Sequence, residues 1–126
     1  MSAMSNYLEL KVLDHILSTT AYTMPTGIYL ALATGTFGED ASGTELSGSA
    51  YARQGDVAFA AASGGTTSNS ANIEFPAATG SWGSVAYWAL FDASSSGNML
   101  IHGAFSAAKT IATGDILRIN AGDLDI

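Results

Sequence analysis

The two histidines are the side chains best suited to exchange a proton near neutral pH, and each stands alone in its sequence pattern. His102 alternates with Leu100 and Ala104 in an apolar run, without a second histidine, a cysteine or a nucleophile at a useful spacing. His15 lies beside Lys11 on the polar side of a helical pattern. We therefore interpret His102 as a packed or interface residue and His15 as a solvated one, and we predict no catalytic residue and no enzyme activity.

Metal binding and glycoside hydrolysis are the two kinds of chemistry that the carboxylates could support. Between Gly38 and Glu45 lie acidic side chains of the type that calcium prefers: Glu39, Asp40 and Glu45. Their spacing matches no known calcium loop such as the EF-hand, so a plain solvated loop competes with a calcium site there. Glu74 and Asp92 form the one carboxylate pair that we would test for hydrolysis. These patterns predict no bound metal and no cofactor.

Composition narrows the class of protein further. The chain has 126 residues, no cysteine, and 11 acidic against 4 basic residues, for a formal charge of −7. Without cysteine, a disulfide framework, a thiolate zinc site and a cysteine nucleophile are all excluded. The negative charge repels phosphate backbones and anionic lipid, and no apolar run reaches the ~18 to 20 residues of a membrane span, so we predict neither nucleic acid nor membrane as a partner. Charged residues make up only 12%, which favours a surface that packs against copies or neighbours.

One amphipathic helix is expected near the start of the chain. Apolar residues recur there at helical spacing: Leu8, Val12, Leu13, Ile16 and Leu17. Asn6 can cap this helix while Glu9 reaches back to it, and the segment TMPTG at residues 23–27 ends it. We predict a helix over about residues 6–22, whose stripe of Leu13, Ile16 and Leu17 covers either the rest of the domain or a neighbouring subunit.

The rest of the chain has the pattern of short β-strands separated by turn residues. Seven runs follow the helix, among them GIYLALA, YARQGDVAFAAA, SVAYWALFDA and NMLIHGAFS. Residues 82–106 predict a hairpin, with Trp88 in its first strand and His102 in its second. The QGD at residues 54–56 indicates a bulge or bend. We predict a single domain over residues 1–126, an antiparallel β-sandwich of jelly-roll or immunoglobulin-like type over about residues 26–126 with the helix at its N-terminus.

Several motifs of the chain are familiar in this order. After SNYLELKVLDHIL come YARQ at residues 51–54, EFPAAT at 74–79, WGSV and FDA within 82–93, and a final AGDLDI. In these motifs the chain resembles small tailed-bacteriophage virion proteins of the tail-fibre-like family, over nearly its whole length. None of the motifs is a catalytic signature, and the resemblance implies a structural role in the tail or in the head. Gly55 and Asp56 depart from the family pattern, in which the strand follows YARQ directly.

Pattern and resemblance together predict a structural component of a phage virion, either a tail-fibre or tail-associated subunit or a capsid decoration protein, that acts by protein–protein assembly. The expected partners are copies of itself and other virion proteins of the tail or capsid, and the expected location is the virion, after synthesis in the host cytoplasm. The alternative is a carbohydrate-binding module for a host-surface glycan, because aromatic side chains stack on sugars. That alternative depends on four aromatics: Tyr51, Trp82, Tyr87 and Trp88. The predicted interface residues are Leu13, Ile16, Leu17, Trp88 and His102.

Overall fold

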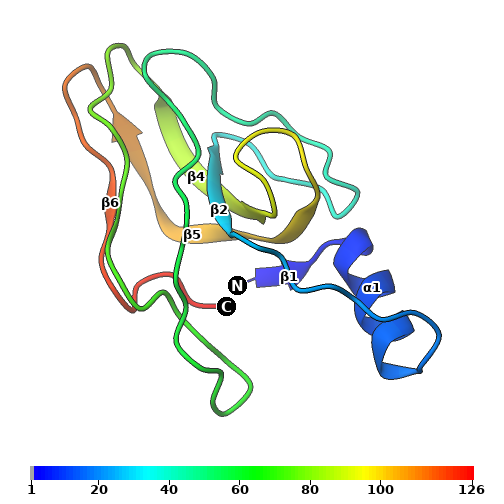
Figure 1. Ribbon diagram of the computed structural model, residues 1–126. Helices are drawn as coiled ribbons and strands as arrows, with labels where there is room; N and C mark the ends of the chain where they lie inside the picture. Colours follow the sequence, from blue (N-terminus) through cyan, green and yellow to red (C-terminus); the bar gives the residue numbers. More distant parts are fainter. Residues whose placement is uncertain (1) are drawn as a thin grey trace.

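The computed structural model describes residues 2–126, which form six β-strands and one α-helix (Figure 1). The elements in chain order are β1 (Ser2–Met4), α1 (Asn6–Ile16), β2 (Tyr29–Ala33), β3 (Ile73–Glu74), β4 (Gly83–Phe91), β5 (Met99–Ile111) and β6 (Arg118–Ile119). An antiparallel sheet has the strand order β1-β5-β4-β2, and β3 pairs with β6 in a second antiparallel sheet. The predicted fold class, mainly antiparallel β with one N-terminal helix, is confirmed.

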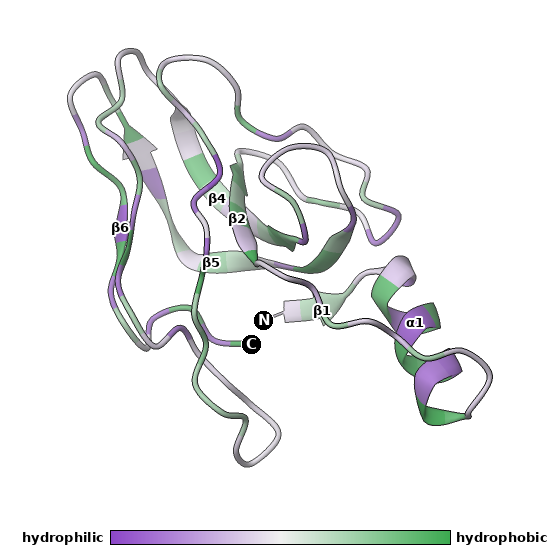
Figure 2. Cartoon of the chain, viewed as in Figure 1, coloured by the Kyte–Doolittle hydropathy of each residue, from purple (hydrophilic) through white to green (hydrophobic). Residues whose placement is uncertain are grey.

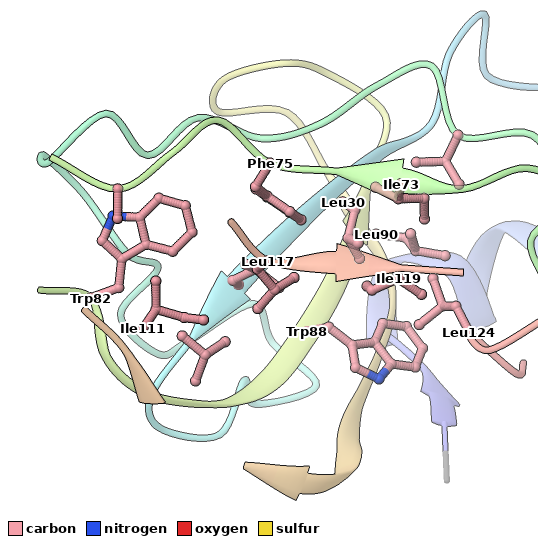
Figure 3. Packing of buried hydrophobic residues seen from close by; sticks show 14 residues of the cluster. Leu30, Ile73, Phe75, Trp82, Trp88, Leu90, Ile111, Leu117, Ile119 and Leu124 are labelled. Atoms are coloured by element: carbon pink, nitrogen blue, oxygen red, sulfur yellow. The ribbon is translucent and has the colours of Figure 1, made fainter. Parts of the chain in front are cut away.

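The main hydrophobic core lies between the two sheets. Its buried side chains come from strands of both sheets and from the loops beside them, and they pack in one layer (Figure 3). They include Leu30, Val85, Trp88 and Leu90 from the larger sheet, Ile73 and Ile119 from the smaller one, and Phe75, Trp82, Leu117 and Leu124 from the adjoining segments. Since apolar side chains of two facing sheets share this core, the arrangement is that of a small sandwich whose second sheet is reduced to two short strands.

The hairpin predicted over residues 82–106 is present as β4 and β5. Leu90 lies opposite Ile101 and faces the main core, whereas Ala89 lies opposite His102 on the other face of the sheet. That other face carries a smaller cluster around Phe91 and Met99. Both faces of the hairpin are therefore covered with apolar side chains, as the sequence pattern predicts.

One predicted strand is irregular, in the run that begins with YARQ. Gln54 forms only an isolated bridge, with Leu30, and the main-chain N–H of Ile28 donates to Asp56 Oδ1 at 3.0 Å rather than to a strand partner. A side chain at Gly55 would collide with the ring of Tyr29, so only glycine fits there. Gly55 and Asp56, which depart from the family pattern, thus interrupt the pairing between Gln54 and Leu30, and it resumes where the N–H of Val57 donates to the carbonyl of Ile28 at 2.8 Å.

The helix is shorter than predicted and begins with a different cap. Ser5, not Asn6, is the N-cap, and its hydroxyl accepts the N–H of Leu8 at 3.2 Å. The helix ends at Ile16 instead of residue 22, because Ser18 takes a positive φ of 62° and the N–H of Thr19 closes back on a carbonyl inside the last turn. Figure 2 shows this short helix beside the sheets, with hydrophobic and hydrophilic residues both along its length.

Candidate functional site

Glu45 is the centre of a polar cluster that the YARQ motif builds. Tyr51 Oη donates to Glu45 Oε1 at 2.7 Å and accepts the main-chain N–H of Leu32 at 3.0 Å. Arg53 donates to both carboxylate oxygens, from Nε at 2.9 Å and from Nη2 at 2.8 Å. This is the bidentate arrangement that gives an arginine–carboxylate pair its geometric specificity. Burial, and then the hydrogen bond to Glu45, raises the pKa of the Tyr51 phenol, so Tyr51 stays neutral and acts as a donor.

Arg53 also ties a distant loop to the sheet. Its Nη1 donates to the carbonyl oxygens of Ala93 at 2.9 Å and Ser96 at 2.8 Å, and its guanidinium lies 3.7 Å from the centre of the Phe91 ring. The side chain is only 7% exposed. All three guanidinium nitrogens of this buried cation donate within the chain, which marks Arg53 as a structural brace for the β4–β5 loop.

The remaining family motifs meet in the core next to this cluster. Tyr51 stacks on Phe75 at 6.2 Å between ring centres and meets the edge of Trp82 at 5.6 Å. Trp82 Nε1 donates to the carbonyl of Ser49 at 3.0 Å. YARQ, EFPAAT and WGSV therefore contribute one ring each to a single aromatic cluster. Sequence reasoning identified these motifs but not their meeting, because nothing in their spacing shows that they are neighbours in space.

The aromatics that suggested sugar stacking are largely used in packing. Trp82 and Trp88 are buried, and Tyr51 is held between Phe75 and the carboxylate of Glu45. Trp88, which we predicted at an interface, is 2% exposed and belongs to the core with Ile119 and Leu124 (Figure 3). This corrects the prediction of a surface contact, since its neighbours within the chain already cover the indole.

The two histidines belong to different elements, α1 and β5, and have different surroundings. His102 stands between Ala3 and Ala89 in the sheet, and its Nε2 is buried with no hydrogen-bond partner among residues 2–126. His15 Nδ1 accepts the N–H of Tyr22 at 3.1 Å, so it fastens the connection that follows α1 rather than pointing freely into solvent.

The acidic side chains of the calcium candidate do not converge. Glu45 is committed to Tyr51 and Arg53, whereas Asp40 Oδ1 accepts the N–H of Ser42 at 3.0 Å within its own turn. These hydrogen bonds lower the pKa of Asp40, which is fully exposed. Across the described part of the chain, no three His, Asp or Glu side chains gather where they could hold one ion.

The carboxylates considered for hydrolysis belong to different parts of the fold. Glu74 stands in β3 opposite Arg118 of β6. Asp92 follows β4, where it accepts hydrogen bonds from the main-chain N–H and the side-chain amide of Asn98 at 2.7 and 2.9 Å. Asp92 therefore closes the β4–β5 loop.

The helix α1 exposes a set of large apolar side chains, which include the predicted interface residues Leu13, Ile16 and Leu17. None of the residues of α1 is buried. Large apolar side chains of the helix are 56 to 69% exposed: Leu10, Leu13, Ile16 and Leu17. Met24, in the connection that follows, is 80% exposed. The predicted stripe of Leu13, Ile16 and Leu17 thus lies on the surface of this chain, and it does not cover the sandwich.

The chain was compared with known protein families and with curated proteins. A family model described as "Podophage GP4 fiber I protein gp80" matches residues 3–126. No curated protein matches the chain. Within residues 2–126, no helix combines the length and apolar character needed to cross a membrane.

Proposed function

This chain belongs to the podophage GP4 fiber I protein gp80 family, and from that membership we propose that it is a non-enzymatic structural subunit of a phage fibre, carried in the virion and acting through protein–protein assembly. The observation that carries the assembly role is the exposed apolar face of α1. The protein partners that we propose are further copies of the chain and the virion proteins next to it.

The exposed helix face supports assembly on energetic grounds. Isolated helices shorter than about 12 to 15 residues are marginal in water, and α1 spans 11 residues with little covering of its own. Covering one leucine or isoleucine side chain stabilises it by roughly 1.5 to 3 kcal/mol. A second protein surface laid over Leu13, Ile16 and Leu17 would therefore stabilise both the helix and the assembly.

The arrangement of the family motifs supports a structural role. Glu45, Tyr51 and Arg53 satisfy one another, and Asp92 closes its own loop. Groups that catalyse reactions need polar atoms free to meet a substrate. Here Tyr51, Arg53 and Asp92 of the family motifs hold loops in place around an aromatic core.

The experiment that tests this function removes the apolar face and keeps the helix. In Leu13→Gln/Leu17→Gln, glutamine preserves helix propensity but removes the apolar contact. Because both leucines are exposed, we expect thermal unfolding of the dilute chain to change little. Light scattering should then show reduced self-association, and particles made with this variant should contain less of it.

Glu9→Gln/Lys11→Gln is the matched control, since it changes exposed or half-buried polar positions of the same helix. This control should assemble like the wild type. Unchanged light scattering and unchanged incorporation for Leu13→Gln/Leu17→Gln would refute the assembly role of the helix face.

A further inference from the structure

A groove runs between the second half of β5 and β6, and it encloses about 410 Å³. On one side it is lined by Phe105, Ser106 and Lys109, and on the other by Arg118 and Asp123. Figure 1 shows β6 beside the far end of β5, away from α1. The groove is therefore separate from the exposed helix face.

The two basic side chains that have no partner within the described part of the chain both line this groove. Of the four basic residues, Arg53 is paired with Glu45 and Lys11 lies over the Tyr7 ring at 5.6 Å. Lys109 and Arg118 line the groove, and neither makes a salt bridge or a side-chain hydrogen bond within the described part of the chain. Asp123 is the one acidic side chain that lines it, so two cations face one carboxylate among the lining residues, and Glu74 of β3 stands opposite Arg118 outside the lining.

The backbone beside the groove is also incompletely paired. The β4–β5 register passes from Val85 opposite Lys109 to Tyr87 opposite Ala104, so only Ala86 stands opposite residues 105–108. On its other edge, β5 pairs with β1 only over Ile101–Gly103. Main-chain N–H groups outside a ladder are donors that a carboxylate can use, and cations nearby strengthen such contacts.

We propose that this groove binds the acidic turn at residues 38–42 of a second copy of the chain. Glu39 and Asp40 are the only two acidic residues adjacent in the sequence, and both are exposed. The proposal names the partner within the assembly role proposed above, and it rests on that role.

The turn is well ordered for such a contact. The N–H of Gly38 donates to the carbonyl of Ser42 at 2.8 Å, and the N–H of Ala41 donates to the carbonyl of Gly38 at 3.0 Å. The hydrogen bonds from Ser42 also lower the pKa of Asp40 and keep its carboxylate charged. A preformed turn loses little conformational entropy on binding.

The contact must join two molecules. The N–H of Asn6 donates to the carbonyl of Glu39 at 2.8 Å, which fixes the turn against the start of α1. In Figure 1, β6 and the far end of β5, which line the groove, lie at the opposite end of the molecule from α1. A turn held at one side and a groove at the other form two different patches, and their pairing gives a head-to-tail contact that closes into a ring or extends along an axis.

Charge reversal of each patch tests the proposal. Lys109→Glu/Arg118→Glu reverses the charge of the groove, and Glu39→Lys/Asp40→Lys reverses the charge of the turn. Each double substitution is made both in the wild type and in the Leu13→Gln/Leu17→Gln protein. Sedimentation velocity at low salt gives the Kd of self-association. We expect each reversal alone to weaken it about tenfold or more, because like charges then face each other. An equimolar mixture of the two reversed proteins should associate again, since each offers a complementary patch to the other.

The turn reversal separates this contact from a general charge effect. It brings the net charge closer to zero, so self-repulsion alone would predict stronger association for this variant, whereas the proposed contact predicts weaker association. Circular dichroism and thermal unfolding confirm that the exposed substitutions leave the fold intact.

Four outcomes would overturn the inference. Wild-type affinity in both reversed proteins would do so, as would failure of their mixture to reassociate. Weakening by the groove reversal alone would mean that another acidic segment or protein occupies the groove. A wild-type chain that does not self-associate would exclude a second copy as the occupant. In each case the assembly role is judged separately, by incorporation of Leu13→Gln/Leu17→Gln into particles.

Discussion

At the scale of single residues, the hydroxyl of Tyr51 has the most consequential position in the chain. It donates to the Glu45 carboxylate and accepts a main-chain N–H from β2, so it joins a loop to the central sheet. An ionised phenolate could not donate to a carboxylate and would repel it. The raised pKa of Tyr51 is the consequence of burial and of this neighbour.

The raised pKa predicts how stability changes at alkaline pH. In the unfolded chain tyrosine ionises near pH 10, whereas in the folded protein Tyr51 keeps its proton. The stabilisation that protonated Tyr51 provides is therefore complete below about pH 10. Above that pH the free energy of unfolding falls, with a slope that approaches about 1.4 kcal/mol per pH unit. Urea unfolding at a series of pH values from about 8 to 11 measures this slope. Tyr51→Phe should be less stable at neutral pH but should lose less stability with rising pH; equal slopes for both proteins would contradict the assignment.

At the scale of elements, the N-terminal arm of β1 and α1 depends on Ser5. The Ser5 hydroxyl accepts from Leu8 and donates to the carbonyl of Met99, and the Ser5 N–H donates to Leu100 at 2.8 Å. The residue is buried, although no residue of the helix itself is. One small side chain thus both starts the helix and attaches it to β5.

Replacing Ser5 should loosen this arm selectively. Ser5→Ala removes the cap and leaves a buried carbonyl without its partner, a loss of about 1 to 2 kcal/mol. Hydrogen exchange of residues 6–16 should become faster, while the amides of β4 should keep their protection. Asn6→Ala is the control, because Asn6 was the cap predicted from the pattern and the structure gives that role to Ser5. If Asn6→Ala accelerated exchange more than Ser5→Ala, the capping assignment would be wrong.

Elements with strong local patterns were predictable, and those fixed by distant contacts were not. The alternation in β4 and β5 predicted the hairpin and its two apolar faces, because period-two patterning is a property of the segment itself. The helix end was missed, since the apolar pattern continues through Leu17 while hydrogen bonds to Asp14 turn the chain away. The YARQ run has strand-like composition, but Arg53 turns toward Glu45 and the distant β4–β5 loop, which no local pattern reveals.

At the scale of the whole molecule, the chain presents two surfaces with different chemistry. The face of α1 is apolar, and the β5–β6 groove carries Lys109 and Arg118. The sequence predicted the apolar stripe of the first surface, since it lies within one helix, but left open whether the stripe covers the domain or a neighbouring subunit. It could not predict the second, because residues 105 and 118 become neighbours only after the sheets pack. A subunit with separate apolar and charged surfaces can contact two neighbours at once, which suits a repeated structure.

Whether the β4–β5 hairpin acts as a scaffold or as a chemical site can be tested by two substitutions in it. Phe91 packs edge-on against Phe37 at 6.4 Å and lies under the Arg53 guanidinium, so Phe91→Ala removes core packing and the support of the loop brace together. We expect a loss of about 3 to 5 kcal/mol, a large part of the 5 to 15 kcal/mol that stabilises a typical domain. His102→Gln should leave thermal unfolding and particle incorporation nearly unchanged, because His102 Nε2 has no hydrogen bond to lose within the described chain. Both variants are compared by calorimetry and by their content in purified particles. Normal folding with lost incorporation for His102→Gln, together with a harmless Phe91→Ala, would show that the imidazole serves a function that packing does not explain.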